Sequence, residues 1–139
     1  MSNEKRLLIV DDEPDFAEIV SEIAESLGFR TLSVTSGKHC LEMAPVFEPD
    51  IILLDLVMPD MDGMEVVMAM GRRGLKTQVI LTTGYDETMI QVAEVLGDGN
   101  GLSMLGSVTK PARVETIEAL LRNGTNEAKE TKEEQRIGA

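Results

Sequence analysis

The stretch IILLDLVMPDMDG, residues 51–63, decides the fold, because it joins a continuous apolar run to a carboxylate and a turn. Residues 51–54 are all apolar, and Asp55 follows them directly. Short apolar runs bounded by polar residues are typical of strands that are buried on both faces of a parallel sheet. Residues 7–10 and 79–81 form runs of the same kind, so the sequence predicts three buried strands.

Between these runs, apolar residues recur at helical spacing, and two further segments have the pattern of strands. The predicted helices lie at about residues 16–27, 37–46, 62–72, 86–97 and 114–121, and the further strands at about residues 31–35 and 104–108. Asp62 and Asp86 are the predicted caps of the third and fourth helices, and Phe16 belongs to the apolar face of the first. Polar and apolar residues alternate in the segment 31–35, which places that strand near an edge of the sheet. The glycine-rich residues 97–101 are interpreted as a connector. This order predicts an α/β fold, a doubly wound five-stranded parallel sheet with helices on both faces and right-handed crossovers.

Composition limits the classes of function. The chain has 139 residues, which fits one domain, and its net charge of −12 argues against a nucleic-acid surface and against binding to anionic lipid. No apolar run approaches the ~20 residues that span a bilayer, and the N-terminus does not resemble a secretory signal. One cysteine, Cys40, suits a reducing cytoplasm. We expect one domain over residues 5–122, followed by a polar, disordered tail over residues 123–139.

Polar side chains follow four of the predicted strands where each strand ends. Asp11 and Asp12 follow the first strand, Asp55 the third, Thr83 the fourth and Lys110 the fifth. Ligands of parallel sheets gather beyond the carboxyl ends of the strands, so these side chains are expected to share one cleft. Each has an ordinary alternative as a helix cap, turn residue, strand-end hydroxyl or solvated charge. The acidity of the chain could likewise serve solubility alone, but the coincidence of four strand ends favours a site.

The chemistry of that cluster suggests phosphoryl transfer. Carboxylates held close together repel one another unless a cation is present, and a few carboxylates with water suit magnesium (Mg2+). A metal ion and Lys110 could offset the charge of a phosphoryl group, and Thr83 could donate a hydrogen bond to it. A carboxylate can act as the nucleophile and form an aspartyl phosphate.

These residues, with their proline and glycine neighbours, closely resemble the response-regulator receiver family of two-component systems. The residues that carry the resemblance are Asp11, Asp12, Asp55, Met58, Pro59, Gly63, Thr83, Gly84, Lys110 and Pro111. The resemblance covers about residues 5–122 and implies a flavodoxin-like (βα)5 fold with strand order 2-1-3-4-5.

The resemblance also implies the role of each site residue. It implies that Asp55 takes a phosphoryl group from a phosphohistidine, that Asp12, Asp55 and the Val57 backbone carbonyl ligate Mg2+, that Asp11 does so through water, and that Thr83 and Lys110 contact the phosphoryl group. The family often carries an aromatic residue three positions before the lysine. Ser107 stands there instead, so the usual rotating aromatic switch is absent.

The expected partners follow from this resemblance. A sensor histidine kinase or a phosphotransfer protein would supply the phosphoryl group, and an effector protein would be contacted in trans, since no effector domain follows Leu121. The expected effector surface comprises the fourth helix, fifth strand and fifth helix, and phosphorylation-dependent dimerisation stays open. We do not expect an enzyme beyond self-phosphorylation and self-dephosphorylation.

Two other functions fit the sequence less well. A magnesium-dependent phosphohydrolase of the haloacid dehalogenase type would need a second aspartate two residues after the nucleophile, where this chain has Val57. The intact acidic cluster, with Thr83 and Lys110, disfavours a degenerate receiver that only binds partners. Val57 and Tyr85 are expected to flank the path of the hydrolytic water, which predicts slow self-dephosphorylation.

Overall fold

The computed structural model describes residues 4–84 and 87–124, in which strands and helices alternate as the sequence predicts. The elements are β1 (Arg6–Val10), α1 (Pro14–Ser26), β2 (Arg30–Val34), α2 (Gly37–Phe47), β3 (Ile51–Asp55), α3 (Gly63–Arg72), β4 (Gln78–Thr83), α4 (Glu87–Gly99) and β5 (Ser103–Thr109). Residues 114–124 form a further helix. None of the helices in the described part of the chain has the length and apolar character needed to span a membrane.

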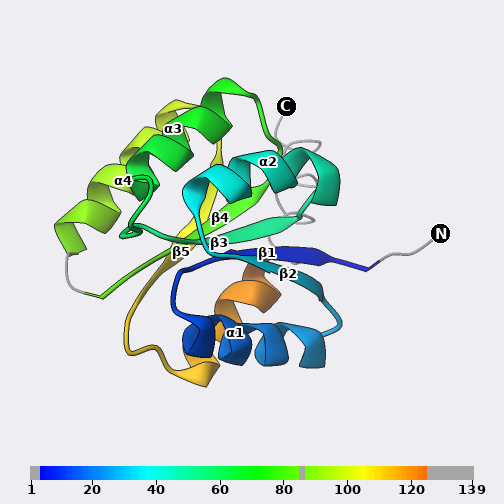
Figure 1. Cartoon of the computed structure of the whole chain (residues 1–139). Helices are drawn as coiled ribbons and strands as arrows, with labels where there is room; N and C mark the ends of the chain where they lie inside the picture. The colour runs from blue at the N-terminus through cyan, green and yellow to red at the C-terminus, as the bar shows by residue number, and fades with distance from the viewer. Residues whose placement is uncertain (1–3, 85–86, 125–139) are drawn as a thin grey trace, which may run out of the picture.

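The strands form one parallel sheet in the order β2-β1-β3-β4-β5 (Figure 1). The predicted fold class, strand order and edge position of the second strand are therefore confirmed. β3 lies at the centre, and all five of its residues are buried, because both of its faces are covered by helices. A central strand that is buried on both faces needs apolar residues at successive positions, and residues 51–54 supply them.

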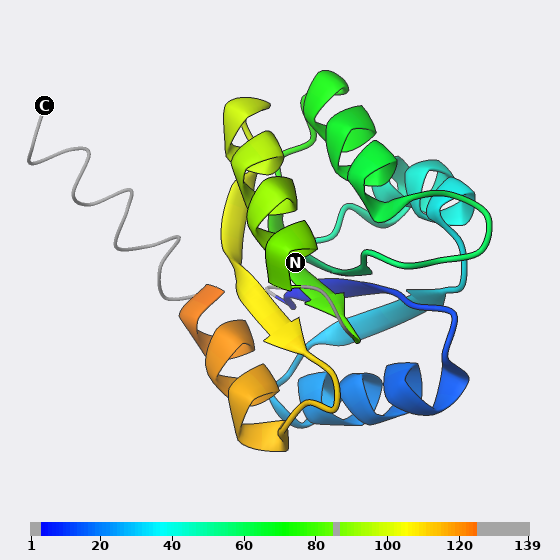
Figure 2. The same cartoon turned by 90° about the vertical axis from the view of Figure 1, so that its left-hand side faces the viewer.

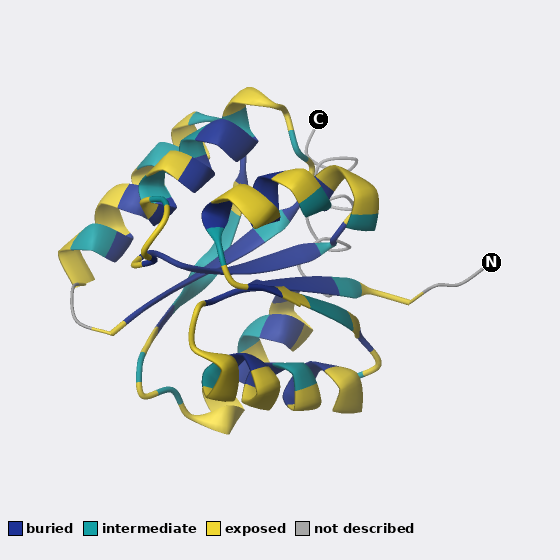
Figure 3. Cartoon of the chain, in the orientation of Figure 1, coloured by how far each residue is buried: buried dark blue, intermediate teal, exposed yellow. Residues whose placement is uncertain are grey.

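Helices cover both faces of the sheet (Figures 1 and 2). α2, α3 and α4 pack on one face, while α1 and the helix 114–124 pack on the other. Alternate residues of each strand point to opposite faces, which divides the apolar core in two. Leu53 and Ile80 belong to the core beneath α1, and Leu54 and Leu81 to the core beneath α2, α3 and α4. β1, β3 and β4 form the buried centre of the molecule, shown mainly in dark blue in Figure 3.

The helix starts agree with the sequence only in part. Asp62 caps α3 as predicted, because its carboxylate accepts a hydrogen bond from the Met64 N–H at 2.9 Å. α1 begins at Pro14 after Glu13, which makes no side-chain cap hydrogen bond. Asp86, the predicted cap of the fourth helix, lies outside the described residues.

Two helices run further than the sequence predicts, and each contains a glycine that packs closely on β5. α4 continues through Gly99, so the predicted connector at residues 97–101 is wrong in its first half. A Cβ on Gly97 would lie 2.4 Å from Met104 Sδ, so the glycine lets α4 pack closely on β5. The last helix reaches Gly124, two residues past the predicted end of the domain at residue 122. A Cβ on Gly124 would lie 2.7 Å from Leu105 Cδ1, and the remaining tail residues, 125–139, lie outside the described part.

Candidate phosphoacceptor site

Three carboxylates meet at the carboxyl edge of the sheet. β1 and β3 are neighbours in register, with Val10 opposite Leu54, so Asp11, just past the end of β1, lies beside Asp55, the last residue of β3. One carboxylate oxygen from each of Asp11, Asp12 and Asp55 lies within 4.8 Å of the other two. The convergence predicted from the strand ends is therefore present in the structure.

Lys110 joins this cluster from the end of β5. Its Nζ atom lies 2.8 Å from Asp11 Oδ2, 3.1 Å from Glu13 Oε1 and 3.2 Å from Asp55 Oδ2. The same ammonium lies 4.5 Å from the centre of the Phe16 ring, within the range of a cation–π contact. The lysine is thus held by carboxylates on one side and by the first turn of α1 on the other.

Backbone donors fix the orientation of the two buried carboxylates. The Glu13 N–H donates to Asp11 Oδ1 at 2.8 Å, and the Val57 N–H donates to Asp55 Oδ1 at 2.9 Å. The Oδ2 atoms of the two aspartates face Lys110. Each carboxylate therefore has one oxygen occupied by its own loop and the other directed into the site.

The loop after Asp55 is packed closely against α3. The Gly63 N–H donates to the Leu56 carbonyl at 3.1 Å, and a Cβ on Gly63 would lie 2.5 Å from Leu56 Cα. No residue other than glycine fits this approach without moving the loop. Gly63 therefore holds in place the segment that carries Asp55 and Val57.

Burial and charge shift the titration of the cluster. Asp11 is 1% exposed and Asp55 is 3% exposed, and burial raises the pKa of both carboxyl groups above the usual value. The Val57 N–H lowers the pKa of Asp55 and the Asp11 charge raises it, with the net shift upward. Burial lowers the pKa of Lys110, but its hydrogen bonds with Asp11 and Glu13 outweigh this and hold it above the usual value. The site thus places the single ammonium of Lys110 against two buried carboxyl groups, those of Asp11 and Asp55.

The fit of a metal ion can be judged from the donors. Asp11, Asp12 and Asp55 offer carboxylate oxygens, the ligands that Mg2+ prefers, and the exposed Asp12 opens the cluster to solvent. The excess of negative charge remains after Lys110 is counted, which favours a further cation. These residues therefore fit a metal site. The Val57 N–H contacts Asp55, and the metal-ligand role of the Val57 carbonyl stays a prediction.

Thr83 ends β4 beside this cluster. Its carbonyl accepts a hydrogen bond from the Lys110 N–H at 2.9 Å, which ties the ends of β4 and β5 together. Its side chain is fully buried, and its Oγ1 atom has no hydrogen-bond partner among the described residues. A buried hydroxyl without a partner is uncommon, so Thr83 has a donor to offer to a ligand. Ser107, where the family often has an aromatic, is partly buried on β5 in register with Leu81.

Sequence reasoning missed two contributors. Glu13 was visible as the third member of an acidic run, but nothing showed that it would contact Lys110. The Phe16 ring had been assigned only to the apolar face of a helix. In both cases the partner is Lys110, far along the chain, so only the order of the strands brings them together.

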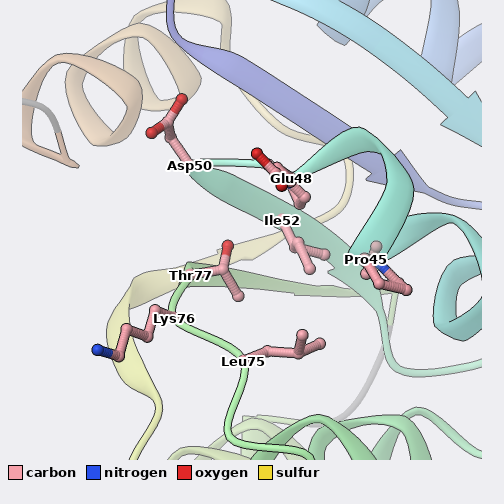
Figure 4. A pocket seen from close by; sticks show the side chains of 9 residues that line it. Pro45, Glu48, Asp50, Ile52, Leu75, Lys76 and Thr77 are labelled. Atoms are coloured by element: carbon pink, nitrogen blue, oxygen red, sulfur yellow. The ribbon is translucent and has the colours of Figure 1, made fainter.

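A separate pocket lies at the opposite edge of the sheet. It has a volume of about 380 Å³ and is lined by Ala44, Pro45, Glu48, Pro49, Asp50, Ile52, Leu75, Lys76 and Thr77. Figure 4 shows the Lys76 ammonium directed away from Ile52 and Pro45. The lining residues precede β3 and β4 or lie at their starts, so this pocket is distinct from the acidic cluster at the strand ends.

Comparison with known proteins agrees with this geometry. Residues 7–122 match the family model of the response regulator receiver domain. The positive alginate biosynthesis regulatory protein of Pseudomonas aeruginosa is 33% identical over 122 residues, which cover 86% of this chain and 46% of that protein. Sporulation initiation phosphotransferase F of Bacillus subtilis is 36% identical over 98 residues, which cover 70% of this chain and 78% of that protein. The chain thus spans less than half of the first relative.

A solved structure shows the same fold. The crystal structure of a response regulator from Colwellia psychrerythraea aligns with a TM-score of 0.75 at 30% identity, covering 88% of this chain and 98% of that one.

Proposed function

This chain belongs to the response regulator receiver domain family of two-component systems, and on that premise we propose that Asp55 accepts a phosphoryl group from a phosphohistidine. The observation that carries the proposal is the position of Lys110 Nζ, 3.2 Å from Asp55 Oδ2 and 2.8 Å from Asp11 Oδ2. An ammonium at this place can hold a phosphoryl oxygen beside the accepting carboxylate. The donor is a sensor histidine kinase or a phosphotransfer protein.

In the transfer, an oxygen of Asp55 forms a bond to phosphorus while the phosphorus–nitrogen bond of the phosphohistidine breaks. The bonding electron pair stays with the imidazole nitrogen. Lys110 contacts one phosphoryl oxygen, and the Thr83 hydroxyl, which lacks a partner among the described residues, donates to another. The protein contributes position and charge, which suffices for phosphoryl transfer.

Asp12, Asp55 and the Val57 carbonyl are the proposed ligands of Mg2+, with Asp11 acting through water. The ion would offset the negative charge of the carboxylates and of the incoming phosphoryl group. Asp12 is the exposed member of the acidic set, so a change there perturbs the buried core least. Asp12→Ala is expected to remove the magnesium dependence of phosphorylation and to slow it.

The output of the domain is proposed to be a change in protein–protein contacts. The net charge of −12 does not suit a DNA surface, and the effector is proposed to be a protein contacted in trans. Because Ser107 offers no ring, the switch is proposed to run through Thr83 and the backbone that follows it. The family resemblance points to α4, β5 and the helix 114–124 as the responding surface. A phosphorylation-dependent dimer is the alternative form of output.

The test is phosphorylation by acetyl phosphate in Mg2+, followed by intact mass. The parent is expected to gain one phosphoryl group, and Asp55→Asn is expected to gain none. Asp60→Asn is the matched control, because Asp60 lies on the same loop but bonds to the start of α2 through the Gly37 and Lys38 N–H groups. Full labelling of Asp55→Asn would show that Asp55 is not the acceptor.

A further inference from the structure

Thr82 is a buried polar residue beside Asp55 that the proposed function does not use. β3 and β4 pair with Asp55 opposite Thr82, and neighbouring strands of a sheet lie ~4.8 Å apart. Side chains alternate along a strand, so Thr82 shares the face of Ile80, and Asp55 shares the face of Leu53. Ile80 and Leu53 both belong to the core beneath α1. Thr82 and Asp55 therefore project side by side on the same face of the sheet.

No residue in the described part of the chain forms a hydrogen bond with the Thr82 hydroxyl in this state. Thr82 is 0% exposed, and its Oγ1 atom has no hydrogen-bond partner among the described residues. Its carbonyl accepts the Leu56 N–H at 3.0 Å, so its backbone is fixed next to the residue that follows Asp55. A valine would fill the same space without an unsatisfied hydroxyl. The hydroxyl therefore costs free energy in this state, which would be offset if another state of the site supplied an acceptor.

Phosphorylation would create such an acceptor next to Thr82. In the present state, Asp55 Oδ1 accepts from the Val57 N–H and Asp55 Oδ2 faces Lys110 at 3.2 Å. When Lys110 turns to the phosphoryl group, Asp55 Oδ2 loses that donor while the residue remains buried. A carboxyl oxygen has two lone pairs, so it can accept a hydrogen bond while it also contacts a cation.

We propose that Thr82 is a positioning residue, whose hydroxyl donates to the Asp55 side-chain oxygen that Lys110 releases during phosphorylation. This inference rests on the proposed acceptor role of Asp55. It differs from the role of Thr83, whose side chain lies on the other face of β4 and is assigned to the phosphoryl group itself. Thr82 instead orients the accepting side chain.

The experiment compares Thr82→Val, Thr82→Ala and Thr82→Ser with the parent. Phosphorylation by acetyl phosphate in Mg2+ is followed by intact mass, and thermal unfolding is measured without donor in EDTA. Thr82→Val and Thr82→Ala are expected to slow phosphorylation about tenfold, whereas Thr82→Ser keeps the parent rate. In EDTA, Thr82→Val is expected to melt at or above the parent temperature, because it removes the unsatisfied hydroxyl. Thr77→Val is the control, a buried threonine just before the other end of β4.

Slow labelling of both variants without the hydroxyl, with rescue by serine, supports the inference, because a packing role would follow side-chain volume. A parent rate in Thr82→Val overturns it, and so does a serine variant as slow as the valine variant. If Thr82→Ala alone is phosphorylated slowly, the inference is also overturned, because that result would follow side-chain volume. If the parent itself takes no phosphoryl group, the proposed function fails and the inference fails with it. If the parent is phosphorylated and Thr82→Val is phosphorylated at the same rate, this inference fails but the proposed function stands.

Discussion

Lys110 Nζ lies 2.8 Å from Asp11 Oδ2, an ion pair that joins the end of β5 to the end of β1 across the width of the site. The side chains of the pair are 11% and 0% exposed, so water screens the pair little. The ammonium also contacts Glu13 and Asp55, and it lies over the Phe16 ring. The Lys110 ammonium thus holds together carboxylates that would otherwise repel one another, before any phosphoryl group arrives.

The first prediction concerns this ammonium. Lys110→Met is expected to lower the free energy of unfolding by about 3 kcal/mol at neutral pH in EDTA, because it leaves buried carboxylates without their cation. Mg2+ is expected to restore part of this loss, since it binds the same carboxylates. Urea unfolding with and without Mg2+ measures both effects. Lys76→Met, at an exposed lysine, is the control and should change stability little. Equal stabilities of the two variants would contradict the structural role of Lys110.

The second prediction concerns pH. Burial raises the pKa of Asp11 and Asp55 above the ordinary value of 3.8, so the folded state holds protons that the unfolded state has released. Stability in EDTA should therefore fall as pH rises through the raised pKa values. Asp55→Asn removes one of these groups, so its melting temperature relative to the parent should increase with pH. In Mg2+ this gain in the melting temperature of Asp55→Asn over the parent should be smaller, because the ion stabilises the charged carboxylates of the parent. A pH-independent difference in EDTA would contradict this account.

The third prediction concerns the close approach of α3 to the loop after Asp55. Gly63→Ala is expected to cost about 3 kcal/mol of stability, because the new Cβ would lie 2.5 Å from Leu56 Cα and 2.9 Å from Leu56 O. Gly99→Ala is the matched control within α4, where a Cβ would meet nothing within 4 Å. That change should stabilise by about 0.5–1 kcal/mol. Urea unfolding measures the free energy of unfolding of both variants. Similar changes in the two would argue against a special constraint at Gly63.

The fourth prediction concerns the lifetime of the phosphorylated form. Val57 is 41% exposed beside the acceptor and cannot hold a water by hydrogen bonding. Val57→Asn is expected to speed dephosphorylation roughly tenfold to a hundredfold, equivalent to ~1.4–2.7 kcal/mol of barrier. The measurement is decay of the phosphorylated mass after removal of the donor, in Mg2+. Val46→Asn, at an exposed valine on α2, is the control. If phosphorylated Val57→Asn decays no faster than the phosphorylated parent, Val57 does not limit the approach of water.

The same question about the approach of water concerns Tyr85, two residues after Thr83 in the sequence. It lies outside the described residues, so its part in the water path remains a prediction from the sequence. Tyr85→Ala is expected to speed the same decay by admitting water. Together with Val57→Asn, this variant tells whether either side chain limits the approach of water.

Much of the fold was predictable because the relevant signals are local. The apolar run before Asp55 indicates a buried central strand, and the alternation in residues 31–35 indicates an edge strand. Asp62 caps α3 through a bond to a residue two positions away. Such features depend on near neighbours in the chain, so periodicity and residue type are enough to predict them.

The composition of the site was predictable for a related reason. In a parallel sheet all strands end at the same edge, so residues that follow strands in the sequence must meet there. That rule was sufficient to bring Asp11, Asp55 and Lys110 together without coordinates. It could not say which oxygen faces Lys110, nor that Glu13 and Phe16 also contact the ammonium.

By itself, then, the sequence determined the alternation of strands and helices and the set of residues at the strand ends. Only the tertiary structure decided that Gly63 touches Leu56 and that Gly97 belongs to a helix packed on Met104. It also decided that Thr82 lies buried beside Asp55, with no partner for its hydroxyl within residues 4–84 and 87–124. The physical reason is that these facts depend on distances between segments far apart in the chain. Those distances are set by the register of the sheet and the close packing of helices on it, to which many residues contribute at once.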